Sequence, residues 1–246
     1  MSNYHTTQKK KTIGRLYGVG VGPGDPELVS LKAQRILSQV QVIFVPRKDA
    51  EYESYAYSII SDLPGSPTQN VVYLVFPMQK GTLEPYWESA AEEIWQHLAQ
   101  GEDCAFVTEG DPLLYGTFAY ILSIFQERYP EVTVEVIPGI SSINAASARA
   151  LFSLASAYER VAIIPATYYE EEALRETLKN FDTVVLLKIN TVFDKILNVL
   201  EEMKLVDRCT YIRRCTTKDE EIVKDIRKLK GKKLDYFSLL IVRRQE

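Results

Sequence analysis

Short apolar runs and helix-like segments alternate along nearly the whole of this 246-residue chain. An alternation of this kind predicts an α/β fold with mainly parallel or mixed sheets. In the first part of the chain, the expected strands are 16–21, 40–46, 70–76, 104–108 and 132–138. The expected helices are 31–40, 51–62, 84–99 and 115–128, with another beginning near 141.

The second part of the chain continues the alternation. The expected strands are 160–166, 182–189, 208–214 and 236–244, and the expected helices are 170–180 and 191–203. Residues 220–226 fit either a strand or a helical turn. The small-residue stretch SLASA at 153–157 indicates a boundary. We therefore expect a disordered tail at 1–14, a first α/β domain at 15–155 and a second α/β domain at 156–246.

Composition narrows the class of function. The formal net charge is −4 at pH 7, which argues against bulk nucleic-acid binding, because that function needs a basic face. No stretch reaches the ~18–20 uninterrupted apolar residues of a membrane span. The first residues, MSNYHTTQKKKT, are polar and basic, without the apolar segment of a secretory signal. A cytoplasmic protein is the expectation.

Cysteine and histidine are scarce. The three cysteines, Cys104, Cys209 and Cys215, fit no CxxC pattern, so reduced thiols are expected. The only histidines are His5 and His97, which is too few for the usual transition-metal ligand sets and disfavours a Ser-His-Asp or Cys-His hydrolase. We expect no protein-bound metal.

The loop GVGVGPGDP, residues 18–26, follows the first expected strand. A dinucleotide fingerprint needs G-x-G-x-x-G, but the sixth position is Pro23 when the count starts at Gly18, and Asp25 when it starts at Gly20. No GK[ST] follows, so the loop is not a Walker A motif either. Two interpretations stay open: a tight strand-to-helix turn, or a backbone that comes close to a ligand.

The loop TEGDPLLYG, residues 108–116, follows the fourth expected strand and repeats the triplet Gly-Asp-Pro. Pro112 suits the first position of a helix, with Asp111 as its N-cap. This local role leaves Glu109, Gly110 and Tyr115 unexplained, and a carboxylate at this edge could also face a ligand. Helix capping and ligand binding do not exclude each other.

A third unusual loop, IPGISS at 137–142, follows the fifth expected strand. Pro138-Gly139 signals a turn, and Ser141 and Ser142 could cap the helix that follows or face a ligand. In an open parallel sheet, ligands bind at the carboxyl ends of strands, near a switch in strand order. Three special loops at three such ends are hard to explain as independent turns, and together they predict a ligand site.

As a set, these loops resemble the tetrapyrrole methylases. The resemblance rests on 18–37, 107–118 and 134–148, and it continues through 159–166, 184–190 and 213–222. It implies a two-domain methyltransferase that is not of the Rossmann type, with S-adenosylmethionine bound in the cleft between the domains. A tetrapyrrole substrate and a homodimer are also implied.

Within the family, EGDPLLYGT, PGISSINAA and VPRKD are most similar to the branch that methylates C20 of precorrin-2 or cobalt-factor II in cobalamin biosynthesis. The resemblance does not say whether the acceptor carries cobalt. Other interpretations are a sister methylase acting at another ring position, a methylase of RNA or protein, and a regulatory module that binds S-adenosylmethionine without chemistry. The acidic composition disfavours the RNA methylase.

The resemblance also assigns residues. The family's donor-binding positions correspond to Pro23, Gly110, Asp111, Leu114, Ser141, Ser142, Leu187, Lys188, Tyr211, Cys215 and Leu239. Cys215 departs from the family pattern, which often has glycine there. Glu109 and Tyr115 are candidate bases by location.

The substrate class that the resemblance implies carries many carboxylates, for which arginine is the best-suited partner. Candidate substrate-binding residues are Arg47, Lys48 and Arg213, with Arg149 and Arg214 as further candidates. The alternative for each of them is a solvated surface charge.

Overall fold

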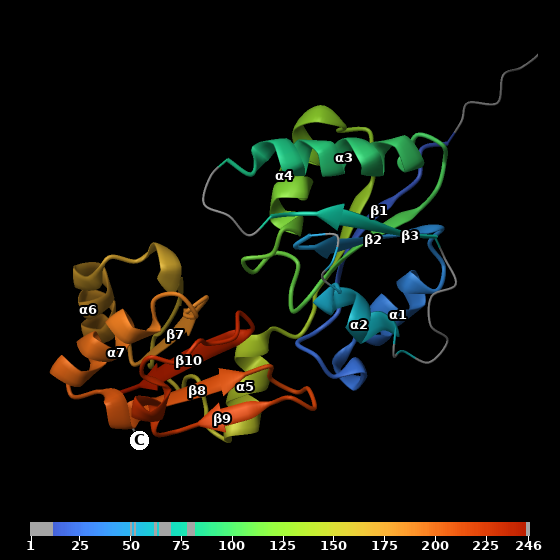
Figure 1. The fold of residues 1–246 in the computed structure, drawn as a ribbon. Coiled ribbons are helices and arrows are strands. Elements are labelled where there is room, and N and C mark those ends of the chain that lie inside the picture. Colours follow the sequence, from blue (N-terminus) through green and yellow to red (C-terminus); the bar gives the residue numbers. More distant parts are fainter. Residues whose placement is uncertain are drawn as a thin grey trace, which may run out of the picture. The chain divides into compact units, whose positions relative to one another are not determined.

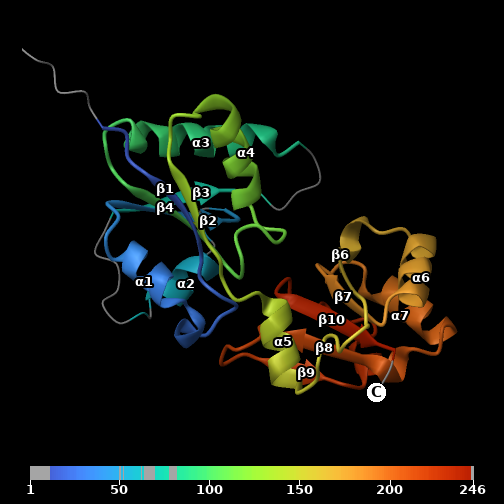
Figure 2. The ribbon, with the colours of Figure 1, turned by 180° about the vertical axis from the view of Figure 1, so that it is seen from behind.

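A computed structural model describes residues 12–49, 51, 53–61, 63, 70–77 and 82–244 (Figures 1 and 2). Most of the expected tail, residues 1–11, lies outside the described residues. The chain divides into two compact units, Met1–Ile140 and Ser141–Glu246. Each unit is built around one five-stranded sheet.

The sheet of the first unit is entirely parallel, with the strand order β3-β2-β4-β1-β5. Its strands are β1 (Leu16–Gly20), β2 (Val42–Arg47), β3 (Asn70–Val75), β4 (Cys104–Thr108) and β5 (Val134–Ile137). All five residues of β1 and of β4 are buried, because helices cover both faces of the sheet. Each of the five expected strands is therefore confirmed.

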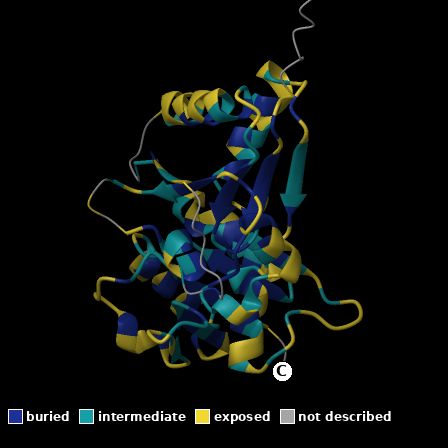
Figure 3. Cartoon of the chain, turned by 90° about the vertical axis from the view of Figure 1, so that its right-hand side faces the viewer, coloured by how far each residue is buried: buried dark blue, intermediate teal, exposed yellow. Residues whose placement is uncertain are grey.

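The helices of the first unit are α1 (Leu31–Leu37), α2 (Tyr55–Ser61), α3 (Glu84–Leu98) and α4 (Phe118–Arg128). The first two pack on one face of the sheet and the last two on the other, as Figure 1 shows. Buried residues fill the strands and the inner helix faces, while exposed residues lie on outer helix faces and loops (Figure 3).

After the neighbouring strands β1 and β4, the chain crosses to opposite faces of the sheet. The loop after β1 leads to α1 on one face, and the loop after β4 leads to α4 on the other. This is the switch point at which open α/β sheets bind ligands. The loops that contain the two Gly-Asp-Pro triplets flank it.

The sheet of the second unit is mixed, with the order β6-β7-β10-β8-β9. Its strands are β6 (Val161–Pro165), β7 (Thr183–Leu187), β8 (Cys209–Arg213), β9 (Glu221–Val223) and β10 (Ser238–Arg243). Only β6 and β7 pair in parallel. Its helices are α5 (Ser142–Ala150), α6 (Glu171–Asn180) and α7 (Phe193–Glu202). Residues 220–226, which fit either a strand or a helical turn by sequence, contain strand β9 and the first residue of a 3-10 turn, Ile226–Leu229.

Helix α5 belongs to the second unit, whereas the boundary expected at 155/156 places it in the first. Its apolar face, including Ile143 and Ala146, shares a buried cluster with Val185, Ile212 and Leu239 of the second sheet. The two compact units divide between Ile140 and Ser141, before α5, and this packing accounts for the place of α5 in the second unit.

Candidate functional site

The first two special loops are joined by their backbones. Gly110 N–H donates to the carbonyl of Gly22 at 2.7 Å, and Gly22 N–H donates to the carbonyl of Gly110 at 3.4 Å. Next to them, Val21 N–H donates to the carbonyl of Thr108 at 2.9 Å. Gly22 has φ 79° and Gly110 has φ 67°, a conformation that favours glycine. The two loops therefore form one structure at the switch point.

The third loop meets the other two at Gly139. A Cβ on Gly139 would lie 2.0 Å from the carbonyl oxygen of Gly110 and 2.8 Å from Cα of Gly20. A Cβ on Gly20 would in turn lie 2.5 Å from the nitrogen of Gly139. We call Gly20, Gly22, Gly110 and Gly139 the glycine junction. The loops after β1, β4 and β5 converge there, as the prediction of one shared site requires.

Asp111 links the second loop to the third. Its Oδ1 accepts a hydrogen bond from Leu113 N–H at 3.0 Å, and its Oδ2 accepts one from Gly139 N–H at 3.1 Å. The expected helix start at Pro112 is wrong, because α4 begins six residues later, at Phe118, after Thr117. Asp111 therefore closes a turn and fastens Gly139, instead of capping a helix.

The other Gly-Asp-Pro triplet has the same local geometry. Asp25 Oδ1 accepts a hydrogen bond from Glu27 N–H at 2.9 Å and caps a short 3-10 turn, Pro26–Leu28. Pro23 is buried in this loop, and its carbonyl accepts a hydrogen bond from the hydroxyl of Tyr55 on α2 at 2.9 Å. Ser30 is the N-cap of α1, since its Oγ accepts a hydrogen bond from Ala33 N–H.

Large apolar side chains are exposed beside the glycine junction. Leu113, Leu114 and Tyr115 of the second loop are 51%, 38% and 45% exposed, and Ile140 of the third loop is 42% exposed. Tyr115 has φ 56°, which costs a non-glycine residue about 1 kcal/mol or more. An apolar surface of this kind at a loop cluster indicates a binding site. Glu109 is half-buried in the same loop.

Arg47 and Lys48 lie at the carboxyl end of β2, as the sequence predicts. The guanidinium carbon of Arg47 lies 4.8 Å from the centre of the Tyr73 ring, close enough for a cation–π contact. Burial, and to a smaller extent Tyr57, raises the pKa of Tyr73. Lys48 is exposed.

The expected donor-site residues of the second unit fall into two groups. Leu187 and Leu239 are cross-strand partners, and they share a cluster with Cys215 on the sheet face that carries α5. Tyr211 lies on the opposite face, in the cluster that includes Phe193 of α7. Side chains alternate between faces along a strand, so the Tyr211 side chain lies on the sheet face opposite that of Leu187 and Leu239.

Three further expected positions of the second unit lie at turns or helix ends. Ser141 is the N-cap of α5, with its Oγ 3.5 Å from Asn144 N–H, and Ser142 is the first residue of the helix. Lys188 has φ 55° just after β7, and its carbonyl accepts a hydrogen bond from Thr167 Oγ1 at 2.6 Å.

The arginines expected to bind substrate in the second unit are engaged by carboxylates. Arg149 pairs with Glu220 at 2.7 Å, Arg214 with Asp235 at 2.7 Å, and Arg213 with Glu221 at 3.3 Å. The arrangement leaves each of them less available to an anionic ligand than the sequence suggests.

Glu220 is the centre of a small polar cluster. It accepts a hydrogen bond from Thr216 N–H at 2.7 Å in addition to those from Arg149. Burial alone would raise the pKa of Glu220, but the hydrogen bonds from Arg149 and Thr216 lower it below its ordinary value. Glu220 thus connects α5 to the turn that holds Cys215.

All three cysteines are buried, and burial raises the pKa of Cys104, Cys209 and Cys215 to about 12 each. Below pH 9 the thiolate, which is the reactive form, is then about a thousandfold scarcer than in an unfolded chain. We expect the native protein at pH 8 to react with an iodoacetamide reagent far more slowly than the urea-unfolded protein. Mass spectrometry of timed samples measures this, and one rapidly labelled cysteine in the native protein would contradict the burial.

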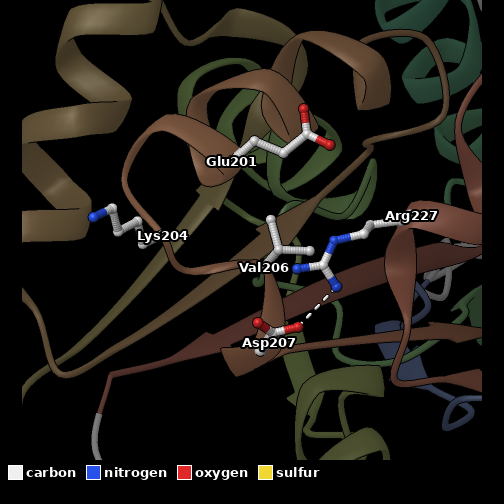
Figure 4. A pocket seen from close by; sticks show the side chains of 5 residues that line it. All are labelled: Glu201, Lys204, Val206, Asp207 and Arg227. Carbon is white, nitrogen blue, oxygen red and sulfur yellow. Dashed lines mark hydrogen bonds and ion pairs between the residues drawn. The ribbon is translucent and has the colours of Figure 1, made fainter.

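A surface pocket of about 230 Å³ lies elsewhere in the second unit, near the end of α7 (Figure 4). Its lining is Glu201, Lys204, Val206, Asp207 and Arg227. Arg227 pairs with Asp207 at 2.7 Å across it, and none of these residues is a predicted site residue. Within the described parts of the chain, no cluster of three or more His, Cys, Asp or Glu side chains could hold a metal ion, and no helix could span a membrane.

Comparison with known proteins places these features in a family. The family model described as Tetrapyrrole (Corrin/Porphyrin) Methylases matches residues 15–229. A Methanocaldococcus jannaschii protein named probable cobalt-precorrin-2 C(20)-methyltransferase is 36% identical, over 95% of this chain and 98% of its own length. A Sinorhizobium protein named precorrin-2 C(20)-methyltransferase is 30% identical, over 94% of this chain and 95% of its own.

A solved structure with a similar fold is that of a cobalt precorrin-4 methyltransferase. It has a TM-score of 0.68 and 20% identity, and the match covers 93% of this chain and 94% of the other. A uroporphyrin-III C-methyltransferase from Thermus thermophilus, complexed with S-adenosylhomocysteine, has a TM-score of 0.67 and 22% identity, covering 94% and 97%. At these identities the likeness establishes the fold.

Proposed function

Because the chain belongs to the tetrapyrrole methylase family, we propose that it transfers a methyl group from S-adenosylmethionine to C20 of precorrin-2 or its cobalt-bound form, in cobalamin biosynthesis. The observation that carries the proposal is the 36% identity with a protein named for this reaction, over nearly the full length of both chains. Relatives at 29% and 30% identity are named for the same ring position. They divide between the cobalt-bound and the cobalt-free acceptor.

The donor would lie against the glycine junction. The carboxyl ends of β1 and β4 lie side by side there, and Leu113 and Leu114 present apolar surface that suits an adenine ring or a thioether chain. The proposed donor-binding residues of the first unit are Pro23, Gly110, Asp111 and Leu114. Those of the second unit are Ser141, Ser142, Leu187, Lys188, Cys215 and Leu239, together with the backbone at Tyr211.

The chemistry asks for positioning more than for a protein nucleophile. The donor supplies a methyl group that is already activated by its positive sulfur, and the acceptor carbon is electron-rich. The chain's task is therefore to hold the two reactants in line at near-contact distance. Asp111 contributes by fixing the second loop to Gly139, and Glu109 or Tyr115 could accept the C20 proton afterwards.

The acceptor's carboxylates would be held by cations. Arg47 is a candidate because it lies at the carboxyl end of β2, where a cation–π contact with the Tyr73 ring orients its guanidinium. Lys48 follows it at the same strand end, and Arg213 would contribute from the second unit. We also propose that the protein acts in the cytoplasm as a homodimer, as the family resemblance implies.

The decisive experiment is incubation with S-adenosylmethionine carrying a labelled methyl group, together with precorrin-2 or with its cobalt-bound form. We expect one labelled methyl group at C20 of one or both tetrapyrroles, located by mass spectrometry and NMR. Omission of the protein and an Asp111→Ala variant are the controls. Label at another ring position would reassign the protein to a sister methylase. Donor binding without label in either tetrapyrrole would favour a regulatory module.

A further inference from the structure

Two threonine hydroxyls are buried without a hydrogen-bond partner among the residues that the structure describes. They belong to Thr108, which is 4% exposed, and Thr183, which is 0% exposed. Burial of a hydroxyl that lacks a hydrogen-bond partner is unfavourable, so it needs an explanation. The two differ in location: Thr183 begins β7, whereas Thr108 ends β4.

Thr108 lies at the switch point. Its backbone carbonyl accepts the hydrogen bond from Val21 of the first loop, and Gly110 of the glycine junction follows two residues later. The Thr108 side chain lies on the face covered by α4, since the strand alternates from Phe106, which belongs to that core. Its Cγ2 would be 3.2 Å from a Cβ placed on Gly116. The Thr108 side chain therefore lies next to the loop that exposes Leu113, Leu114 and Tyr115.

We propose that Thr108 Oγ1 donates a hydrogen bond to S-adenosylmethionine bound at the glycine junction, directly or through one water molecule. This rests on the function proposed above. The donor molecule offers acceptors in its ribose hydroxyls, its carboxylate and its adenine nitrogens, and a threonine hydroxyl can serve any of them. In the complex, the hydroxyl gains the hydrogen-bond partner that it lacks in the free protein. Binding thus removes the free-energy penalty of the unpaired hydroxyl, which favours the complex.

The experiment compares three variants: Thr108→Val, Thr108→Ser and Thr183→Val. Valine keeps the shape of threonine and removes the hydroxyl, whereas serine keeps the hydroxyl. S-adenosylhomocysteine affinity is measured by titration calorimetry, and stability by urea unfolding. Thr183→Val is the matched control, because it removes the other buried, unpartnered hydroxyl, which belongs to β7 of the second unit and not to the loops of the glycine junction.

We expect Thr183→Val to leave the affinity unchanged and the stability equal or higher. Thr108→Val should also keep or raise the stability of the free protein, but it should weaken S-adenosylhomocysteine binding about three- to tenfold, the value of one neutral hydrogen bond. Thr108→Ser should bind within about twofold of the wild type. Stability and affinity moving in opposite directions is a result that a merely structural hydroxyl does not produce.

Two outcomes would overturn the proposal. Unchanged affinity in Thr108→Val would make its hydroxyl equivalent to that of Thr183. Equal losses in Thr108→Val and Thr108→Ser would assign the effect to the packing of the side chain, because serine keeps the hydroxyl. If Thr108→Val does not fold, Thr108→Ala takes its place in the same comparison. Failure of the wild type itself to bind S-adenosylhomocysteine would instead count against the proposed function.

Discussion

Replacing Gly139 with alanine is expected to destabilise the protein by about 3 kcal/mol or more and to abolish measurable donor binding. The added Cβ would lie 2.0 Å from the carbonyl oxygen of Gly110 and 2.8 Å from Cα of Gly20, both of them backbone atoms of other loops. Backbone cannot rotate away as a side chain can, so the loops must separate, which costs more than ordinary overpacking. Urea unfolding and calorimetric titration with S-adenosylhomocysteine measure the two effects.

The matched control for this change is Gly231→Ala. Gly231 has φ 70°, but no atom lies within 4 Å of the position of its Cβ, so the control carries backbone strain without a clash. It should cost about 1 kcal/mol and leave donor affinity unchanged. A Gly139→Ala variant as stable as Gly231→Ala would show that the three loops are not in contact as described.

Replacing Asp111 with alanine is expected to cost about 2–4 kcal/mol of stability and to weaken donor binding at least about tenfold, while unfolding stays cooperative. The change removes two acceptors at once and leaves the N–H groups of Leu113 and Gly139 without their partner. Asp111→Asn keeps only one of the two acceptor oxygens. Its stability and donor affinity should therefore lie between those of the wild type and of Asp111→Ala. The same unfolding and titration measurements apply.

Asp25→Ala is the matched comparison, because Asp25 occupies the same position in the other Gly-Asp-Pro triplet, residues 24–26. Asp25 accepts the equivalent hydrogen bond within its own turn, from Glu27 N–H, and its loss should cost about 1 kcal/mol, as for an N-cap. The excess cost of Asp111→Ala over Asp25→Ala measures the link to Gly139. Equal costs would mean that this link contributes nothing.

The strands could be predicted from the sequence because each is a short apolar run bounded by turn residues, as CAFVT between Asp103 and Glu109 illustrates. Once the strands were expected to be parallel, their carboxyl ends had to share one edge. The meeting of the first, second and third loops therefore followed from local patterns. Four large side chains are exposed there. Leu114 and Tyr115 are among the site residues expected from the sequence, whereas Leu113 and Ile140 are not.

The pairings between loops could not be predicted, because they join residues that are distant in sequence. Nothing near Asp111 signals that its second oxygen holds Gly139, 28 residues away. Asp-Pro suits both the start of a helix and a turn, which explains the wrong helix start at Pro112. The sequence of α5 likewise does not indicate which sheet the helix packs against.

Surface loops usually accept insertions and deletions readily, and related enzymes diverge by changing loop length. The hydrogen bonds between Gly22 and Gly110, and from Gly139 to Asp111, remove that freedom here. One residue inserted between Thr108 and Gly110 would shift Gly110 out of register with Gly22. We therefore expect this surface to diverge mainly by exchange of the outward side chains at Leu113, Tyr115 and Ile140, with loop lengths preserved.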